Sequence, residues 1–335
     1  MSGSTESLRR KIAGAEDLEG VVRSMKALAA SSIGQYEKAV QSLHEYYRTV
    51  ELGLAACLGQ TKPVSFLTSA PPHRGGMGAV VFGSDQGLVG RFNEVLVEFA
   101  VRTIKTLPGK RAKIWAIGGR AHALMADTGL NMAGPLSVPT SVSAITPLMG
   151  EILIEIEAAR EQGDVVAVYV FHNQPQAGSG YEPVSKRLLP LDQTWQHKLA
   201  AMPWPTKRLP EVIEGTASPL HAFIREYLFV LLFQACAESL ASENASRLAA
   251  MQRAEKNIED ISKQLNRTLH RIRQESIDEE LFDVISGFEA LTGKSIKPRK
   301  PLLHPRQHSP SAAIRPSPSD TEQLRHLQAK IVAKV

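Results

Sequence analysis

Two long stretches of the chain carry apolar residues at helical spacing and contain no proline. They cover residues 1–62 and 220–297. Proline removes a helix hydrogen bond and clashes with the preceding turn, so its absence from two periodic stretches predicts two very long helices. The stretches lie at opposite ends of the sequence, and they share an apolar seam only if the segment between them brings its ends together. The pattern predicts a long antiparallel coiled coil that carries a globular domain.

In the first stretch the apolar positions follow steps of three and four, as in a coiled-coil seam. They are Leu8, Ile12, Ala15, Val22, Met25, Ala29, Tyr36, Val40, Leu43, Tyr47, Val50, Leu54 and Cys57. Glu19 and Ser32 interrupt the seam, and a stutter after Tyr36 is expected to loosen the supercoil there. At roughly 1.5 Å per residue, a helix of about 50 residues is about 75 Å long.

The second long helix is predicted to begin at Pro219, with Ser218 as the N-cap, because proline suits the first helical position and serine caps free amides. It is expected to end near Ser286 with Gly287 as the C-cap. Residues 238–246 are rich in Ala, Ser and Asn and hold one large apolar side chain, Leu240. Another backbone is therefore expected to approach the helix closely at that point.

Between the two helices the pattern changes to short β-rich runs that are followed by helical spacing. Strands are predicted at 79–82, 113–117, 165–171 and 184–189, and helices at 93–107, 120–127 and 144–161. Strands that alternate with helices predict a mainly parallel sheet with helices packed on it. The fold class is therefore α/β. The predicted domains are an N-terminal helix (1–62), a Rossmann-like α/β domain (75–210), a C-terminal helix (218–291) and a tail (292–335).

The formal net charge of +5 belongs to the tail and not to the folded part. Beyond Leu291 there are nine Lys or Arg and two Asp or Glu, a surplus of seven that leaves residues 1–291 at −2. This segment is rich in proline and poor in apolar residues, so disorder is expected. No run of about 20 apolar residues and no signal sequence is recognised, and Cys57 and Cys236 are expected to be buried thiols in a reducing compartment. These features favour a bacterial or archaeal cytoplasm.

The chemistry-bearing candidate is the glycine-rich loop Gly83 to Gly90, which follows a strand and precedes a helix. Such loops often hold phosphate with helix-start amides. This one lacks the Gly-Lys-Ser/Thr ending of a Walker loop and the Gly-x-Gly-x-x-Gly fingerprint. A structural turn is the favoured interpretation, and nucleotide binding is kept as an alternative. No metal-ligand grouping and no Ser, His and Asp arrangement is recognised, so no catalytic residue, cofactor or metal is predicted.

Five segments together resemble the gamma subunit of F-type ATP synthases. They are 8–12 (LRRKI), 24–31 (SMKALAAS), 83–93 (GSDQGLVGRFN), 238–248 (ESLASENASRL) and 273–281 (RQESIDEEL). The similarity runs from Leu8 to about Leu291 in the family's order. It implies a rotor shaft of paired helices that penetrates a ring of alpha and beta subunits, with an α/β head that stands on the membrane c-ring, in a subunit that is not itself an enzyme.

The resemblance also implies partners and a location. The expected partners are the alpha and beta subunits of the catalytic head, the epsilon subunit and the membrane c-ring, without nucleic acid and without a transmembrane segment of the chain's own. The expected location is peripheral, on the cytoplasmic face of the bacterial plasma membrane. By family position, the expected contacts between rotor and stator are Met25, Arg247, Gln274 and Glu275.

Some residues depart from the family pattern. Glu16, Asp17 and Glu19 make the N-terminal helix acidic where it is usually basic, Lys26 stands where an acidic residue is common, and Asp278 replaces a small hydroxyl residue. The tail has no counterpart in ordinary members. These departures favour a divergent branch, such as the alternative, sodium-type bacterial ATPases.

Two other classes of function stay open from the sequence. One is a phosphate- or nucleotide-binding enzyme that uses residues 83–90, which predicts ligand affinity in the middle domain. The other is a coiled-coil scaffold protein whose basic tail touches nucleic acid, which predicts salt-sensitive binding. The rotor interpretation instead predicts recovery of the chain with alpha and beta subunits.

Overall fold

The computed structural model describes residues 2–60, 75–107, 111–176, 180–191, 193–206 and 219–292. The chain divides into two units, Met1–Ile272 and Arg273–Val335. The first unit holds the α/β head and the helices packed on it. Of the second unit, residues 273–292 are described, and they are helical. The expected disorder of the tail and the expected N-cap Ser218 lie outside the described residues.

Two long helices dominate the first unit, as the absence of proline predicts. Helix α1 spans Ser2–Gln60 and helix α7 spans Pro219–Thr292. Helix α7 begins at Pro219, as predicted, but the end predicted near Ser286 is wrong because the helix continues through Gly287. A glycine inside a helix costs only about 1 kcal/mol relative to alanine, and the residues that follow Gly287 are ordinary helix formers.

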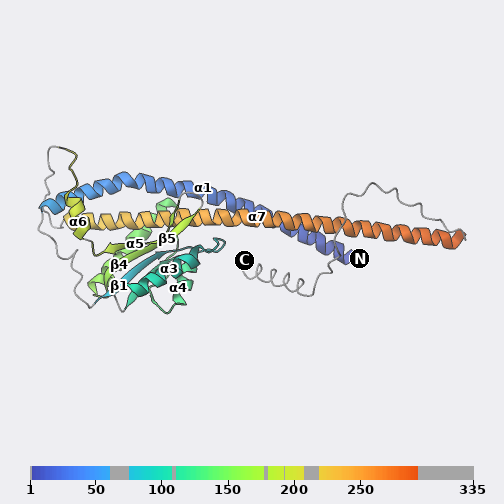
Figure 1. Cartoon of the computed structure of the whole chain (residues 1–335), viewed down its shortest axis with the longest axis horizontal. Helices are drawn as coiled ribbons and strands as arrows, with labels where there is room; N and C mark the ends of the chain where they lie inside the picture. The colour runs from blue at the N-terminus through green and yellow to red at the C-terminus, as the bar shows by residue number, and fades with distance from the viewer. Residues whose placement is uncertain are drawn as a thin grey trace. The chain divides into compact units, whose positions relative to one another are not determined.

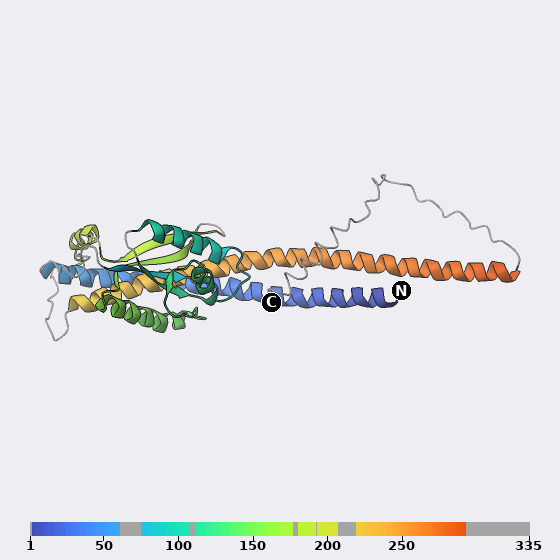
Figure 2. The same ribbon diagram turned by 90° about the horizontal axis from the view of Figure 1, so that it is seen from below.

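Contacts between α1 and α7 show that the two helices run antiparallel. Lys26 pairs with Glu255, Tyr46 with Glu226, and the ring of Tyr47 lies 5.8 Å from that of Tyr227, so the partner number falls as the α1 number rises. Figures 1 and 2 show the two helices side by side along the head. A Cβ atom at Gly53 of α1 would lie 2.4 Å from the Phe223 ring of α7, so glycine makes room for that ring.

The head contains a five-stranded sheet in the order β3-β2-β1-β4-β5. Its strands are β1 (Gly76–Phe82), β2 (Ala112–Ile117), β3 (Asn131–Met132), β4 (Val165–Pro175) and β5 (Tyr181–Leu189). The first four strands pair in parallel, and β5 is antiparallel to β4. The described helices of the head are α3 (Phe92–Thr106), α4 (Gly119–Ala126), α5 (Val142–Glu161) and α6 (Gln193–Ala200).

The four predicted strands and three predicted head helices are all present, and the α/β fold class with its mainly parallel sheet is confirmed. Strand β3 and helix α6 were not predicted. Strand β3 has two residues, which are too few to show a period in the sequence. The buried thiols expected at Cys57 and Cys236 are also found.

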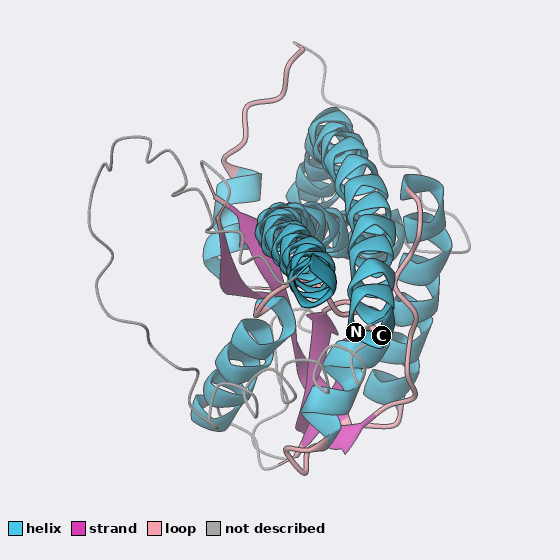
Figure 3. Cartoon of the chain, turned by 90° about the vertical axis from the view of Figure 1, so that its right-hand side faces the viewer, coloured by secondary structure: helices cyan, strands magenta, loops and turns pink. Residues whose placement is uncertain are grey.

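Each face of the sheet packs against a different set of helices, because side chains alternate along a strand. Val80 and Phe82 of β1 face a core that includes α5 and both long helices, whereas Ala79 and Val81 face a core built with α3. Figure 3 shows helices on both sides of the strands. From α1, this shared core takes the residues Tyr36, Val50, Leu54 and Cys57. The long helices are thus part of the head's own core.

Helix α7 is the one helix of the described residues that is long and apolar enough to cross a membrane. Its most apolar 18-residue window has a mean hydropathy of 1.3, and 56% of that window is buried inside the protein. Leu232, Ala237 and Leu240 of α7 belong to the core shared with the sheet. The core of the head therefore accounts for much of this apolar stretch.

Leu54→Ala tests whether α1 belongs to the core of the head. Leu54 is completely buried, and truncating a buried leucine to alanine costs about 2–5 kcal/mol. We expect the unfolding free energy, measured by urea denaturation, to fall by that amount. The control is Leu18→Ala, which removes the same atoms from a side chain that is 48% exposed, where the change is expected to stay within about 0.5 kcal/mol. Equal effects of the two substitutions would contradict the shared core.

Candidate functional site

Residues 238–246 of α7, which are rich in small side chains, form the stretch where the helix meets the head. Three of its serines donate hydrogen bonds to carbonyl oxygens: Ser239 to Phe82 at 2.8 Å, Ser242 to Asn173 at 2.9 Å and Ser246 to Val89 at 2.5 Å. Phe82 ends β1, and Asn173 lies near the end of β4. The close approach predicted for residues 238–246 is confirmed. We call these three contacts the serine seam.

A buried polar pair lies beside the serine seam. His172 of β4 has no exposed surface, and its Nε2 lies 2.7 Å from Oε2 of Glu238 on α7. Burial lowers the pKa of His172. Its Nδ1 has no hydrogen-bond partner among the described residues. In a neutral ring that donates from Nε2, the unpaired Nδ1 is an acceptor, whereas in a charged ring it would be an unpaired donor. The unpaired acceptor costs less free energy, so we assign the neutral ring.

The carboxyl group of Glu238 accepts this hydrogen bond as a carboxylate. Burial acts to raise the pKa of Glu238, but the hydrogen bond from His172 and the nearby charge of Lys186 outweigh that effect and lower it. Gln234 donates a second hydrogen bond to the carboxyl group, at 2.7 Å. The pair thus fixes one register of α7 against the sheet.

The loop from Gly83 to Gly90 uses its polar groups internally. The backbone amide of Ser84 donates to Asn93 Oδ1 at 3.0 Å, and Asn93 Nδ2 donates back to Ser84 Oγ at 2.8 Å. The Asp85 carboxylate accepts the amide of Gly119, the first residue of α4, at 2.8 Å and that of Val138 at 2.9 Å. A carboxylate therefore occupies the helix start where a phosphate would bind.

Gly118 makes this arrangement possible. Its φ is +103°, in the region that favours glycine, and a Cβ atom there would lie 2.6 Å from the carbonyl oxygen of Ser84. The geometry supports a structural turn and not a nucleotide site. Among the described residues no cluster of three or more His, Cys, Asp or Glu is placed to hold a metal ion.

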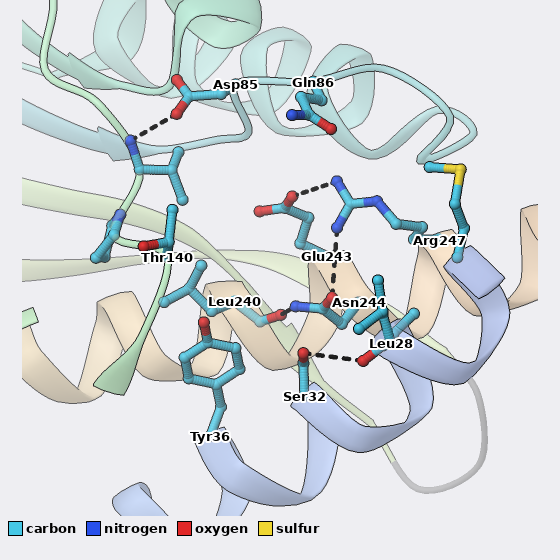
Figure 4. A pocket seen from close by; sticks show the side chains of 14 residues that line it. Leu28, Ser32, Tyr36, Asp85, Gln86, Thr140, Leu240, Glu243, Asn244 and Arg247 are labelled. Atoms are coloured by element: carbon cyan, nitrogen blue, oxygen red, sulfur yellow. Dashed lines mark hydrogen bonds and ion pairs between the residues drawn. The ribbon is translucent and has the colours of Figure 1, made fainter. Parts of the chain in front are cut away.

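A cavity of about 290 Å³ lies between α1, α7 and the loops of the head (Figure 4). Two of the four expected contact residues, Met25 and Arg247, line it together. The Arg247 guanidinium donates to Glu243 at 2.6 Å and to Asn244 at 3.3 Å. Its side chain is 15% exposed, and that of Glu243 is 7% exposed. Burial raises the pKa of Glu243, and the Arg247 charge opposes that effect.

The other two expected contact residues, Gln274 and Glu275, lie in the second unit. Both are exposed, and Gln274 donates to Asp278 at 3.1 Å. The structure therefore places two of the expected residues on the cavity and two on the described helix of the second unit. Whether any of the four touches a partner stays a prediction.

One cross-helix contact was not expected from the sequence. Lys26, noted as a departure from the family pattern, pairs with Glu255 of α7 at 2.6 Å, and both side chains are about one third exposed. The sequence signal for this pair is the opposite charge of the two residues. It identifies the pair only after the register of α1 against α7 is known.

The pair of His172 and Glu238 predicts a pH dependence of stability. The folded pKa of His172 is below the ordinary value of about 6.5, so below pH 6.5 the unfolded chain binds a proton that the folded chain does not. Stability is expected to fall as the pH drops through this window, by at most about 1.4 kcal/mol per pH unit. Because Glu238 has a lowered pKa, it adds to the loss only at more acidic pH.

The measurement is urea denaturation of the wild-type chain and of His172→Gln between pH 7 and pH 5. Glutamine retains an N–H donor for Glu238 but does not titrate. The free-energy difference between the two proteins is expected to change steadily with pH. Parallel curves for the two proteins would show that His172 is not the titrating group.

Comparison with known proteins places these features in a family. A family model described as ATP synthase matches residues 4–291. The ATP synthase gamma chain of Frankia casuarinae is 27% identical over 297 residues, which cover 87% of this chain and 99% of the relative. That of Cupriavidus pinatubonensis is 26% identical, with 86% and 99% covered.

A solved structure shares the fold. It is a chain of the Euglena gracilis mitochondrial ATP synthase, from the assembly of OSCP, F1 and c-ring, with a TM-score of 0.60 and 16% identity. The likeness covers 91% of this chain and 100% of that one. Because the family model matches the greater part of the sequence, the chain belongs to the gamma-subunit family of ATP synthases.

Proposed function

We propose that the chain is the central-stalk rotor subunit of a bacterial F-type ATP synthase. In this proposal it joins the alpha and beta subunits of the catalytic head, the epsilon subunit and the c-ring, at the cytoplasmic face of the plasma membrane. It couples ion flow through the c-ring to ATP synthesis or hydrolysis elsewhere in the complex and has no catalytic site of its own. The sequence departures noted above favour a divergent branch of the family.

The observation that carries the proposal is the core shared by the head and the long helices. A rotor has to transmit torque, so its shaft and its head must turn together. Leu54 of α1 and Leu232 of α7 lie in one hydrophobic cluster with Val80 and Phe82 of the sheet, and the serine seam adds directional bonds. Packed interiors of this kind are stiff, which suits a part that has to transmit torque.

Coupling also requires that the shaft present unlike faces to similar partners. A rotating asymmetric shaft stabilises a different conformation of each surrounding subunit in turn, and it shifts populations by the difference in contact free energy. The two long helices differ in sequence along their whole length. Arg247 and Met25, which both line the cavity, are the residues of the first unit that we propose as such a contact.

Co-purification from membranes tests the function. A tagged chain expressed in its own host is expected to recover alpha and beta subunits in stoichiometric amounts, together with c-ring subunits. Recovery of the chain alone, or with nucleic acid that high salt removes, would contradict the rotor proposal. A parallel measurement of nucleotide binding by the purified full-length chain checks the alternative at Gly83 to Gly90, for which no affinity is expected.

Arg247→Glu tests the proposed contact. The substitution reverses the charge and sets two carboxylates, at positions 243 and 247, beside each other. Loss of about 1 kcal/mol of differential contact changes a conformational population about fivefold. We therefore expect weaker ATP-driven ion pumping for each ATP hydrolysed, measured in inverted membrane vesicles.

The control for Arg247→Glu is Lys105→Glu. This substitution makes the same charge change at an exposed position of α3. Both variants have to assemble into comparable amounts of complex before their pumping is compared. Normal pumping by Arg247→Glu in assembled complexes would remove Arg247 from the contact.

A further inference from the structure

A charged pair joins the two long helices beside the cavity. The ammonium group of Lys26 on α1 lies 2.6 Å from the carboxylate of Glu255 on α7, and the two side chains are 36% and 28% exposed. Both charges are partly withdrawn from water, so they attract each other more strongly than a fully exposed pair does. The two residues are 229 positions apart in the sequence, so the pair forms only when the helices pack.

The buried residues of α1 place Lys26 in the coiled-coil seam. Four residues at seven-residue intervals are each at most 9% exposed, and they are Ala15, Val22, Ala29 and Tyr36. A heptad has a second seam position four residues after the first, which gives positions 19, 26 and 33. Apolar spacing alone assigns Met25 to the seam, whereas the buried series assigns Lys26. Met25 then lies beside the seam and lines the cavity.

Glu255 occupies the corresponding place on α7. Met251 is 2% exposed, and three partly buried residues follow it at seven-residue intervals, namely Ile258, Leu265 and Ile272. Glu255 stands four residues after Met251, in the second seam series. The places one heptad to either side of Glu255 hold Leu248 and Ser262, which carry no charge. Glu255 is therefore the acidic residue of this stretch of seam that matches Lys26.

The apolar part of the seam is weak near this pair. The seam residues of α1 that are buried here are Ala15, Val22 and Ala29, all of them small. Burial stabilises in proportion to the apolar area that it removes from water. Beyond position 36 the helix instead contributes Tyr36 and Leu54 to the core of the head. The ion pair therefore accounts for a larger share of the attraction between α1 and α7 near position 26 than it would inside the head.

We propose that Lys26 and Glu255 are a positioning pair, which holds α1 against α7 and so keeps Met25 and Arg247 on one cavity. Met25 directly precedes Lys26, and Leu28 of the same helix also lines the cavity (Figure 4). Arg247 lies about two turns before Glu255 on α7. Separation of the helices at the pair moves one wall of the cavity away from the other. The effect on coupling rests on the proposed function, whereas the effect on the helices does not.

Charge reversal in the full-length chain tests the pair itself. Lys26→Glu sets two carboxylates against each other and is expected to raise amide hydrogen exchange in residues 5–24 of α1 about fivefold, because local protection follows the free energy of local opening. Lys26→Glu combined with Glu255→Lys restores opposite charges and is expected to return the exchange to near the wild-type rate. Unchanged exchange in the single variant, or no recovery in the double variant, overturns the proposal.

The control for exchange is Lys38→Glu. It makes the same charge change at an exposed position of α1, and exchange in residues 5–24 is expected to stay near the wild-type rate. An equal rise in Lys38→Glu and Lys26→Glu would show a general effect of charge on the helix and would overturn the pair.

The same variants in the assembled complex test the positioning role. Lys26→Glu is expected to lower ATP-driven ion pumping for each ATP hydrolysed about twofold in inverted membrane vesicles, and the double variant is expected to restore it. Lys105→Glu again serves as the control, and all variants are compared at equal amounts of complex. Normal pumping by Lys26→Glu, in spite of raised exchange, overturns the positioning role. Failure of the wild-type chain to recover alpha and beta subunits contradicts the proposed function instead, and the exchange result still decides the pair.

Discussion

The first unit depends on how closely the backbone of α7 approaches the ends of strands β1 and β4. The helix comes close enough to reach the carbonyl oxygens of Phe82, Asn173 and Val89 because positions 239, 242 and 246 carry the small side chain of serine. This approach brings the apolar face of α7 onto the sheet, and α1 then packs against both. The small-residue stretch, which looks like a weak point of a coiled coil, is thus the place where the two parts of the unit are joined.

Polar groups inside this junction select one arrangement among many. An apolar seam alone allows a helix to slide by a turn with little penalty, whereas His172 and Glu238 pair in one register only. Moving α7 would leave a buried carboxylate without its donors, and that costs several kcal/mol. The junction therefore combines the burial of apolar side chains, which is non-directional, with a few directional hydrogen bonds. The hydrogen bonds determine the register of α7 against the sheet.

Much of the fold follows from the sequence, because its signals are local. The absence of proline predicts both long helices, and alternation of strand and helix predicts the sheet. The register of α1 against α7 does not follow, since Lys26 with Glu255 and Gly53 with Phe223 are pairs that only tertiary packing creates. The predicted end of α7 was wrong because a glycine permits a C-cap without requiring one. Met25 and Arg247 were chosen through the family resemblance, and their shared cavity required the structure.

The carboxylate of Asp85 has a consequence for a protein that works beside nucleotides. A strand, a glycine-rich turn and a helix start make an anion site by default, and an ATP synthase works where ATP, ADP and phosphate are abundant. Here the side chain of Asp85 already supplies the negative charge that the first amide of α4 attracts. Free phosphate is excluded from that position, because the carboxylate of Asp85 already fills it and repels a second anion.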